Sequence, residues 1–80
     1  MSAEEDQAAI RHVEIETVHC SLSGREFSVT LARVGKVWAL NVSALNTYQR
    51  MMVFDVLSDG GWVYRLTTGG GLDEHWVFTR

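Results

Sequence analysis

The chain has 80 residues, 46% of them hydrophobic and 21% charged, with a formal net charge of -3 and one cysteine. Its length excludes a second domain, its apolar fraction excludes wholesale disorder, and the single Cys20 excludes an intramolecular disulfide, so we expect a small cytoplasmic protein. No run approaches the roughly 20 apolar residues of a membrane span, and the acidic start of the chain is unlike a basic secretory leader.

The first predicted element is a short helix over residues 3–11. Ser2 and Glu5 have the spacing of a capping box, and acidic residues in the first turn favour the helix dipole. Ile10 is the one large apolar residue of this helix, so the helix can cover little surface. We therefore predict an acidic helical segment over residues 1–11, followed by a single β domain over residues 12–80.

Three antiparallel strands are predicted between residues 13 and 43. Residues 13–16 alternate in one phase and residues 18–22 in the opposite phase, which predicts a bulge near Thr17. A second alternation covers residues 27–32 and follows a turn at Ser23-Gly24. A turn at Gly35-Lys36 then leads into a third strand, so the three strands are predicted to form a meander.

Residues 43–58 allow two interpretations. Val53, Phe54 and Val56 favour a strand over residues 51–57, because β-branched and aromatic side chains suit sheets. The alternative is a helix over about residues 44–57, capped by Ser43 and ended at Gly60. We favour the strand, because Asp-Gly between two β-rich runs is a strong signal for a hairpin turn.

Two further strands are predicted over residues 62–67 and 75–79, joined by a loop that contains three glycines. The predicted fold class is mainly β, a small antiparallel sheet or partly closed barrel of five to six strands with a short N-terminal helix. A helix at about residues 44–57 would make the fold α+β. The loop at Gly69–Gly71 lacks the continuation of a phosphate-binding loop, so we interpret it as a flexible connection, with a mobile loop that closes on a partner as the alternative.

Large apolar side chains that share one face of a strand predict the core. The predicted core residues are Phe27, Leu31, Trp38, Leu40, Phe54, Trp62, Tyr64, Trp76 and Phe78. Leu66 is expected on the same strand face as Trp62 and Tyr64, because the three alternate along the sequence.

The opposite strand faces, which also include Ala39, carry more apolar side chains than open solvent favours, which predicts an interaction surface. Its predicted members are Val37, Met51, Val53, Leu57, Val63 and Val77. A closed barrel that buries both faces internally is the alternative.

Neither a metal site nor a catalytic site is predicted. His19 and Cys20 are adjacent, so they point to opposite faces of a strand and cannot bind one ion together. No serine lies in a nucleophile-elbow sequence, and the acidic pair Asp73-Glu74 suits a solvated loop. We therefore expect no enzyme activity, no cofactor and no bound metal.

Charge is distributed unevenly along the chain. Residues 1–16 hold five acids and one base, a net of -4, and the remainder holds six bases and five acids, a net of +1. This balance is unlike the basic surface of a typical nucleic-acid-binding protein. A nucleic-acid-binding β module is therefore the less favoured alternative, and it would gather five cationic residues on one surface: Arg25, Arg33, Lys36, Arg50 and Arg65.

The favoured function is a non-enzymatic protein-interaction module that binds a larger protein partner or a second copy of itself. Compact acidic domains without catalytic motifs are common among adaptors and inhibitors, including those encoded by phages and mobile elements. We expect no membrane partner, and no segment is diagnostic of a known family.

Overall fold

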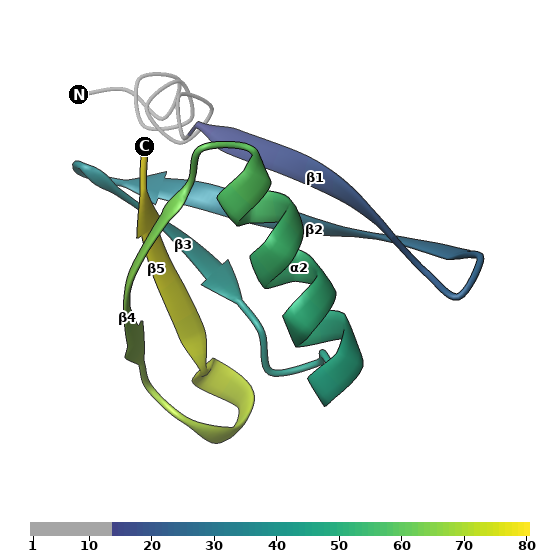
Figure 1. Cartoon of the computed structure of the whole chain (residues 1–80). Helices are drawn as coiled ribbons and strands as arrows, with labels where there is room; N and C mark the ends of the chain where they lie inside the picture. The colour runs from purple at the N-terminus through teal and green to yellow at the C-terminus, as the bar shows by residue number, and fades with distance from the viewer. Residues whose placement is uncertain (1–13) are drawn as a thin grey trace, which may run out of the picture.

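The computed structural model describes residues 14–80 and consists of one antiparallel sheet and one long helix (Figure 1). The elements in chain order are β1 (Ile15–Leu22), β2 (Arg25–Val34), β3 (Val37–Asn41), α2 (Thr47–Asp59), β4 (Val63–Thr68), the 3₁₀ turn η1 (Gly71–Asp73) and β5 (His75–Thr79). The predicted mainly β class with five strands is confirmed, and the sheet is open. The helix predicted over residues 3–11 lies outside the described residues.

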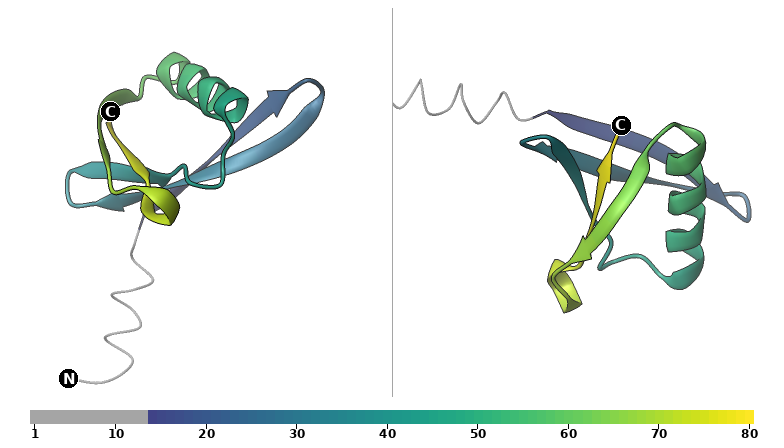
Figure 2. Two further views of the ribbon diagram at one scale, coloured as in Figure 1. Left: turned by 90° about the horizontal axis from the view of Figure 1, so that it is seen from below. Right: turned by 60° about the vertical axis from the view of Figure 1, so that its left-hand side comes forward.

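The five strands lie in the order β1-β2-β3-β5-β4, and every neighbouring pair is antiparallel. The first three strands form the predicted meander, and β5 pairs with both β3 and β4. Helix α2 packs against one face of the twisted sheet, and Figure 2 shows the sheet and the helix from two further sides. We call the sheet face toward α2 the inner face and the opposite one the outer face.

Strand β1 pairs with β2 without interruption, which corrects the bulge predicted near Thr17. Ile15 lies opposite Ala32, and the alternation continues in a single phase to the end of the strand. Cys20 is therefore buried and Val18 packs against the core, whereas Ile15 is 64% exposed on the outer face.

The irregularity in the sheet lies in β4 instead. Tyr64 is opposite Phe78 and Leu66 is opposite Val77, so one extra residue, Arg65, is inserted between two consecutive pairs. An inserted residue reverses which face the following side chains occupy. Leu66 therefore lies on the outer face, and the prediction that it shares a face with Tyr64 is wrong.

The strand predicted over residues 51–57 is wrong, because these residues form the middle of α2. The N-cap is Asn46, three residues beyond the Ser43 of the helical alternative. Asn46 Oδ1 accepts a hydrogen bond from the Gln49 backbone N–H at 2.8 Å, and Gln49 Oε1 accepts one from the Asn46 N–H at 2.9 Å. This reciprocal capping box satisfies two backbone donors and starts the helix.

The hairpin turn predicted at Asp59-Gly60 is instead the end of α2. The Trp62 N–H donates to the Leu57 carbonyl oxygen at 2.9 Å, which closes the last turn of the helix. Gly61 adopts a φ of 89°, a conformation that side chains rarely allow. The chain therefore passes from the helix directly into β4.

The loop between β4 and β5 is held by local contacts. Gly69 adopts a φ of 68°, and a Cβ atom there would collide with the Asp73 carbonyl oxygen, so this position requires glycine. The Asp73 N–H donates to the Gly70 carbonyl at 3.1 Å, and Asn41 Nδ2 donates to the Leu72 carbonyl at 3.4 Å. The loop thus has contacts that fix it to the end of β3.

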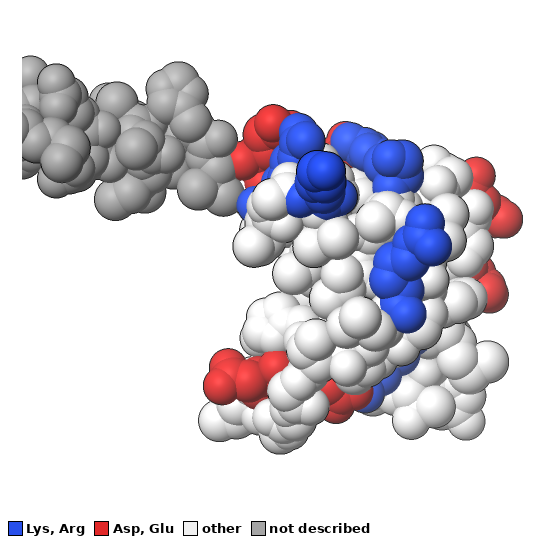
Figure 3. All heavy atoms as spheres, turned by 90° about the vertical axis from the view of Figure 1, so that its left-hand side faces the viewer, with Lys and Arg blue, Asp and Glu red and all other residues white. Residues whose placement is uncertain are grey.

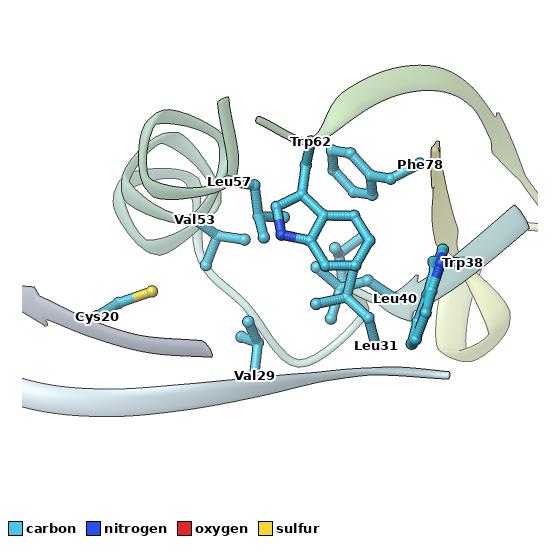
Figure 4. Packing of buried hydrophobic residues seen from close by; sticks show 10 residues of the cluster. Cys20, Val29, Leu31, Trp38, Leu40, Val53, Leu57, Trp62 and Phe78 are labelled. Carbon is cyan, nitrogen blue, oxygen red and sulfur yellow. The ribbon is translucent and has the colours of Figure 1, made fainter. Parts of the chain in front are cut away.

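The core lies between α2 and the inner face of the sheet (Figure 4). Five of the nine predicted core residues are buried: Leu31, Trp38, Leu40, Trp62 and Phe78. Phe27 and Trp76 are partly buried against them, whereas Phe54 and Tyr64 are each 39% exposed and lie at the margin of the core. The rings of Trp38 and Trp62 meet edge to face, with centroids 5.3 Å apart.

Candidate functional site

The six residues predicted as an interaction surface do not lie together. Val53 and Leu57 are fully buried in the core, because α2 turns them toward the sheet, so their assignment to a second strand face is wrong. Met51 is on the same helix but 61% exposed. The register places the other three on the outer face of the sheet: Val37, Val63 and Val77.

A row of apolar side chains crosses the outer face, with one residue from each strand. Successive paired residues of the register make up the row: Ile15, Ala32, Ala39, Val77 and Leu66. The two ends of this row are open, since Ile15 is 64% and Leu66 48% exposed.

A second set of outer-face residues lies beside this row, toward the β2–β3 turn. Val34 pairs with Val37, and Val63 pairs with Thr79. Val34 is 63% and Val63 47% exposed. Apolar residues of the outer face therefore extend across the described sheet from one edge strand to the other.

Sequence reasoning missed four members of this surface: Ile15, Ala32, Val34 and Leu66. A single alternation phase through β1 and β2 would have placed the first three on the sheet face that is opposite to the face of Leu31. Leu66 gave no such signal, because nothing in the residues around Arg65 marks the bulge that turns it outward.

The five cations of the nucleic-acid alternative are divided between different parts of the fold. Arg25 begins β2 and Lys36 follows its other end, so a strand of 10 residues, about 30 Å, separates them. Arg33 forms an ion pair with Glu14, and Arg50 forms one with Glu74.

Figure 3 shows Lys and Arg side chains gathered at one end of the face it presents, with acidic side chains beside and below them. Arg65 lies at the bulge of β4, and its Nε donates to Thr79 Oγ1 at 2.8 Å. The Arg80 guanidinium covers the Trp62 ring, 4.2 Å from its centroid, and forms an ion pair with Glu16. Arg65 and Arg80 are therefore both engaged within the domain.

The residues considered for metal binding are placed apart. Cys20 is buried on the inner face, whereas its neighbour His19 is exposed and points to the outer face, as the alternation predicts. Within residues 14–80, no group of three His, Cys, Asp or Glu side chains is close enough to hold a metal ion.

Cys20 is expected to be a poorly reactive thiol. Its side chain is 4% exposed, and burial raises the pKa of the Cys20 thiol above its usual range, so little thiolate forms near neutral pH. Reaction with Ellman's reagent at pH 8 should be about a hundredfold slower in the native protein than in urea. Rapid stoichiometric labelling of the native protein would contradict this expectation.

Comparisons with protein-family models, with curated proteins and with solved structures return no match for this chain. Among the described residues, no helix has the length and apolar character needed to cross a membrane.

Proposed function

We propose that this chain is a non-enzymatic protein-interaction module and that the outer face of its sheet is an interface. The observation that carries the proposal is the apolar row contributed by all five strands, on the face of the sheet opposite α2. Exposing such a face to water is energetically unfavourable, and large contiguous apolar patches on small domains usually mark binding sites.

The size of the face matches a protein interface. The four most exposed apolar residues on the outer face are Ile15, Val34, Val63 and Leu66. With their half-buried neighbours they expose on the order of 500 Å² of apolar surface, near the largest patch of a typical monomer. A polar rim around such a patch brings the total close to the roughly 800 Å² per partner of a standard complex.

We propose a second copy of the chain as the occupant. The apolar row contains no Asp, Glu, Lys or Arg, and neither do the paired residues beside it, which are Thr17 with Thr30 on β1 and β2, and Asn41, His75 and Thr68 on β3, β5 and β4. Rows without charge can meet the same rows of a second copy without like-charge repulsion, and twofold dimers are the commonest assemblies. Two such sheets would pack face to face at about 10 Å, as in β-sandwiches.

A charge placed on this face should separate the two copies. Leu66→Lys, at a 48% exposed position, should leave the fold intact and weaken dimerisation about a hundredfold or more, because each interface would bury two unpaired cations. Sedimentation equilibrium and light scattering measure the mass, and circular dichroism measures the fold.

The matched control is Leu72→Lys, which makes the same substitution at an 87% exposed site in η1 and should stay dimeric. A wild-type chain that is monomeric at every concentration would contradict the proposal. A Leu66→Lys variant that dimerises like wild type would also contradict it, and both results would leave a different protein or another segment of this chain as the occupant.

The proposed compartment is the cytoplasm, supported by the free Cys20 and by a core that holds together without a disulfide. The nucleic-acid alternative receives less support, since Arg25 and Lys36 lie at opposite ends of β2 and Arg50 is engaged with Glu74.

A further inference from the structure

A hollow lies between α2 and β5 on the inner side of the sheet. Its volume is about 300 Å³, and six residues line it: Thr47, Arg50, Met51, Phe54, Asp55 and Trp76. We call it the helix groove. Its wall is almost entirely carbon, which is the character of pockets that hold bulky apolar groups.

Aromatic rings form the floor of the helix groove and its margin. The Phe54 ring meets the Trp76 ring edge to face, with centroids 6.0 Å apart, and lies 5.8 Å from the Tyr64 ring. Trp76 in turn meets Phe78 of the buried core at 6.3 Å. The rings of the groove floor are thus held by contacts with the buried core. A ligand that binds to rings already held in place costs less side-chain entropy.

The groove is open to solvent at the residues that usually supply binding energy. Of the lining residues, Met51 is 61% and Phe54 39% exposed, and Tyr64, which contacts Phe54 from outside the lining, is also 39% exposed. Aromatic side chains and methionine are enriched at the centres of protein interfaces, because they offer large contact areas and adapt to their partners. An apolar side chain entering here would cover surface that α2 and the sheet leave open.

Arg50 does not offer its charge to a ligand. Its guanidinium donates to Glu74 Oε2 and to the Val42 carbonyl, both at 3.0 Å, and to the Leu45 carbonyl at 3.1 Å. The ion pair neutralises Arg50, and the three hydrogen bonds hold it in the wall. The cation nearest the apolar wall is therefore already engaged within the domain.

The rim of the groove on α2 is acidic. Asp55 lines the opening and is exposed, and Asp59, also exposed, follows four residues later on the same side of the helix. With Arg50 neutralised by Glu74, the charge that a ligand meets beside the apolar wall is negative. A cation next to the inserted apolar group would be attracted to Asp55.

We propose that the helix groove binds a segment of a partner protein that inserts one bulky apolar side chain and places an adjacent Lys or Arg against Asp55. The groove lies on the side of the sheet opposite the outer face, so a dimer formed through that face leaves it open. The inference therefore stands independently of the proposed dimer, and a dimeric chain would carry two such grooves.

Two blocked dipeptides test this directly in the full chain by NMR titration. The probes are N-acetyl-Phe-Lys-amide and N-acetyl-Phe-Glu-amide, which share the apolar side chain and differ in charge. The Phe-Lys probe should shift the Met51 methyl and Trp76 indole resonances saturably, with a Kd on the order of millimolar for so small a ligand. The Phe-Glu probe should bind about threefold or more weakly.

Asp55→Asn should abolish the difference between the two probes, because it removes the charge and keeps the shape. Glu26→Gln is the matched control, since Glu26 is an exposed acid at the far end of β2 and outside the groove; it should keep the difference. Shifts that never saturate, shifts centred away from Met51 and Trp76, or a preference unchanged in Asp55→Asn would each overturn the proposal.

The same titration on Leu66→Lys separates this proposal from the dimer. Leu66 lies on the outer face, away from the groove, so probe binding should be unchanged whether the wild-type chain is a dimer or a monomer. Loss of probe binding in this folded variant would contradict a groove that is complete within one chain.

Discussion

Val53→Lys is expected to unfold the domain. Val53 is fully buried on the side of α2 that faces the sheet, where a lysine would have neither water nor an acidic partner within the core. Burying an unpaired charge costs about 3–5 kcal/mol or more, against a total stability of about 4–12 kcal/mol for a domain of this size. Thermal unfolding followed by circular dichroism measures the loss.

Met51→Lys is the control for this prediction, because it adds the same charge two residues earlier in the same helix. Met51 is 61% exposed and lysine is a good helix former, so stability should change by no more than about 0.5 kcal/mol. On a strand, residues 51 and 53 would point to the same face and respond alike. Equal effects of the two substitutions would therefore contradict the helix.

The strands could be predicted because their alternation is regular and their turns are marked by glycine. Phe27, Val29 and Leu31 repeat every second residue, and all three face the inner side. Gly24 and Gly35 both adopt positive φ at the turns that bound β2. Local sequence and tertiary packing agree over the first three strands, so the amino-acid sequence alone predicts them.

Helix α2 was the less favoured of the two interpretations, because the strand preference of its β-branched and aromatic residues competes with its capping signal. Val53 and Val56 favour strands, but each lies in the apolar helical pattern that faces the sheet. The spacing of Asn46 and Gln49 is that of a capping box and was visible in the sequence. Burial against the sheet outweighs the modest helix penalty of β-branched residues.

The outer face could be predicted only in part, because its membership depends on the phase of each strand. Val37, Val63 and Val77 were placed correctly on a face away from the core aromatics. The bulge at Arg65 moves Leu66 to that same face, and the hydrophobic periodicity does not indicate this bulge because Tyr64 and Leu66 stay in one phase along the sequence. The helix groove could not be predicted from the strand interpretation, because five of its six lining residues come together only when residues 47–55 are helical.

Phe78→Ala is expected to be the most damaging truncation of an aromatic residue in the sheet. Phe78 is fully buried on β5, opposite Trp38 on one side and Tyr64 on the other. Removing its ring leaves a cavity beneath α2 and should cost about 3–5 kcal/mol, most of the stability of so small a domain. Urea denaturation measures the shift of the midpoint at constant slope.

Phe54→Ala makes the same chemical change at a ring that is 39% exposed on α2, and it separates burial from aromatic contact. Both rings contact aromatic neighbours, since Phe54 lies 6.0 Å from Trp76 and Phe78 lies 5.9 Å from Tyr64. If burial dominates, Phe54→Ala should cost only about 1–2 kcal/mol, because solvent already reaches that ring and can fill the space it leaves. Equal losses of stability in the two variants would contradict this and point to the aromatic contacts as the main source of stability. An aromatic pair contributes only about 0.5–1.5 kcal/mol beyond burial, which is too little to account for a loss of the size expected for Phe78→Ala.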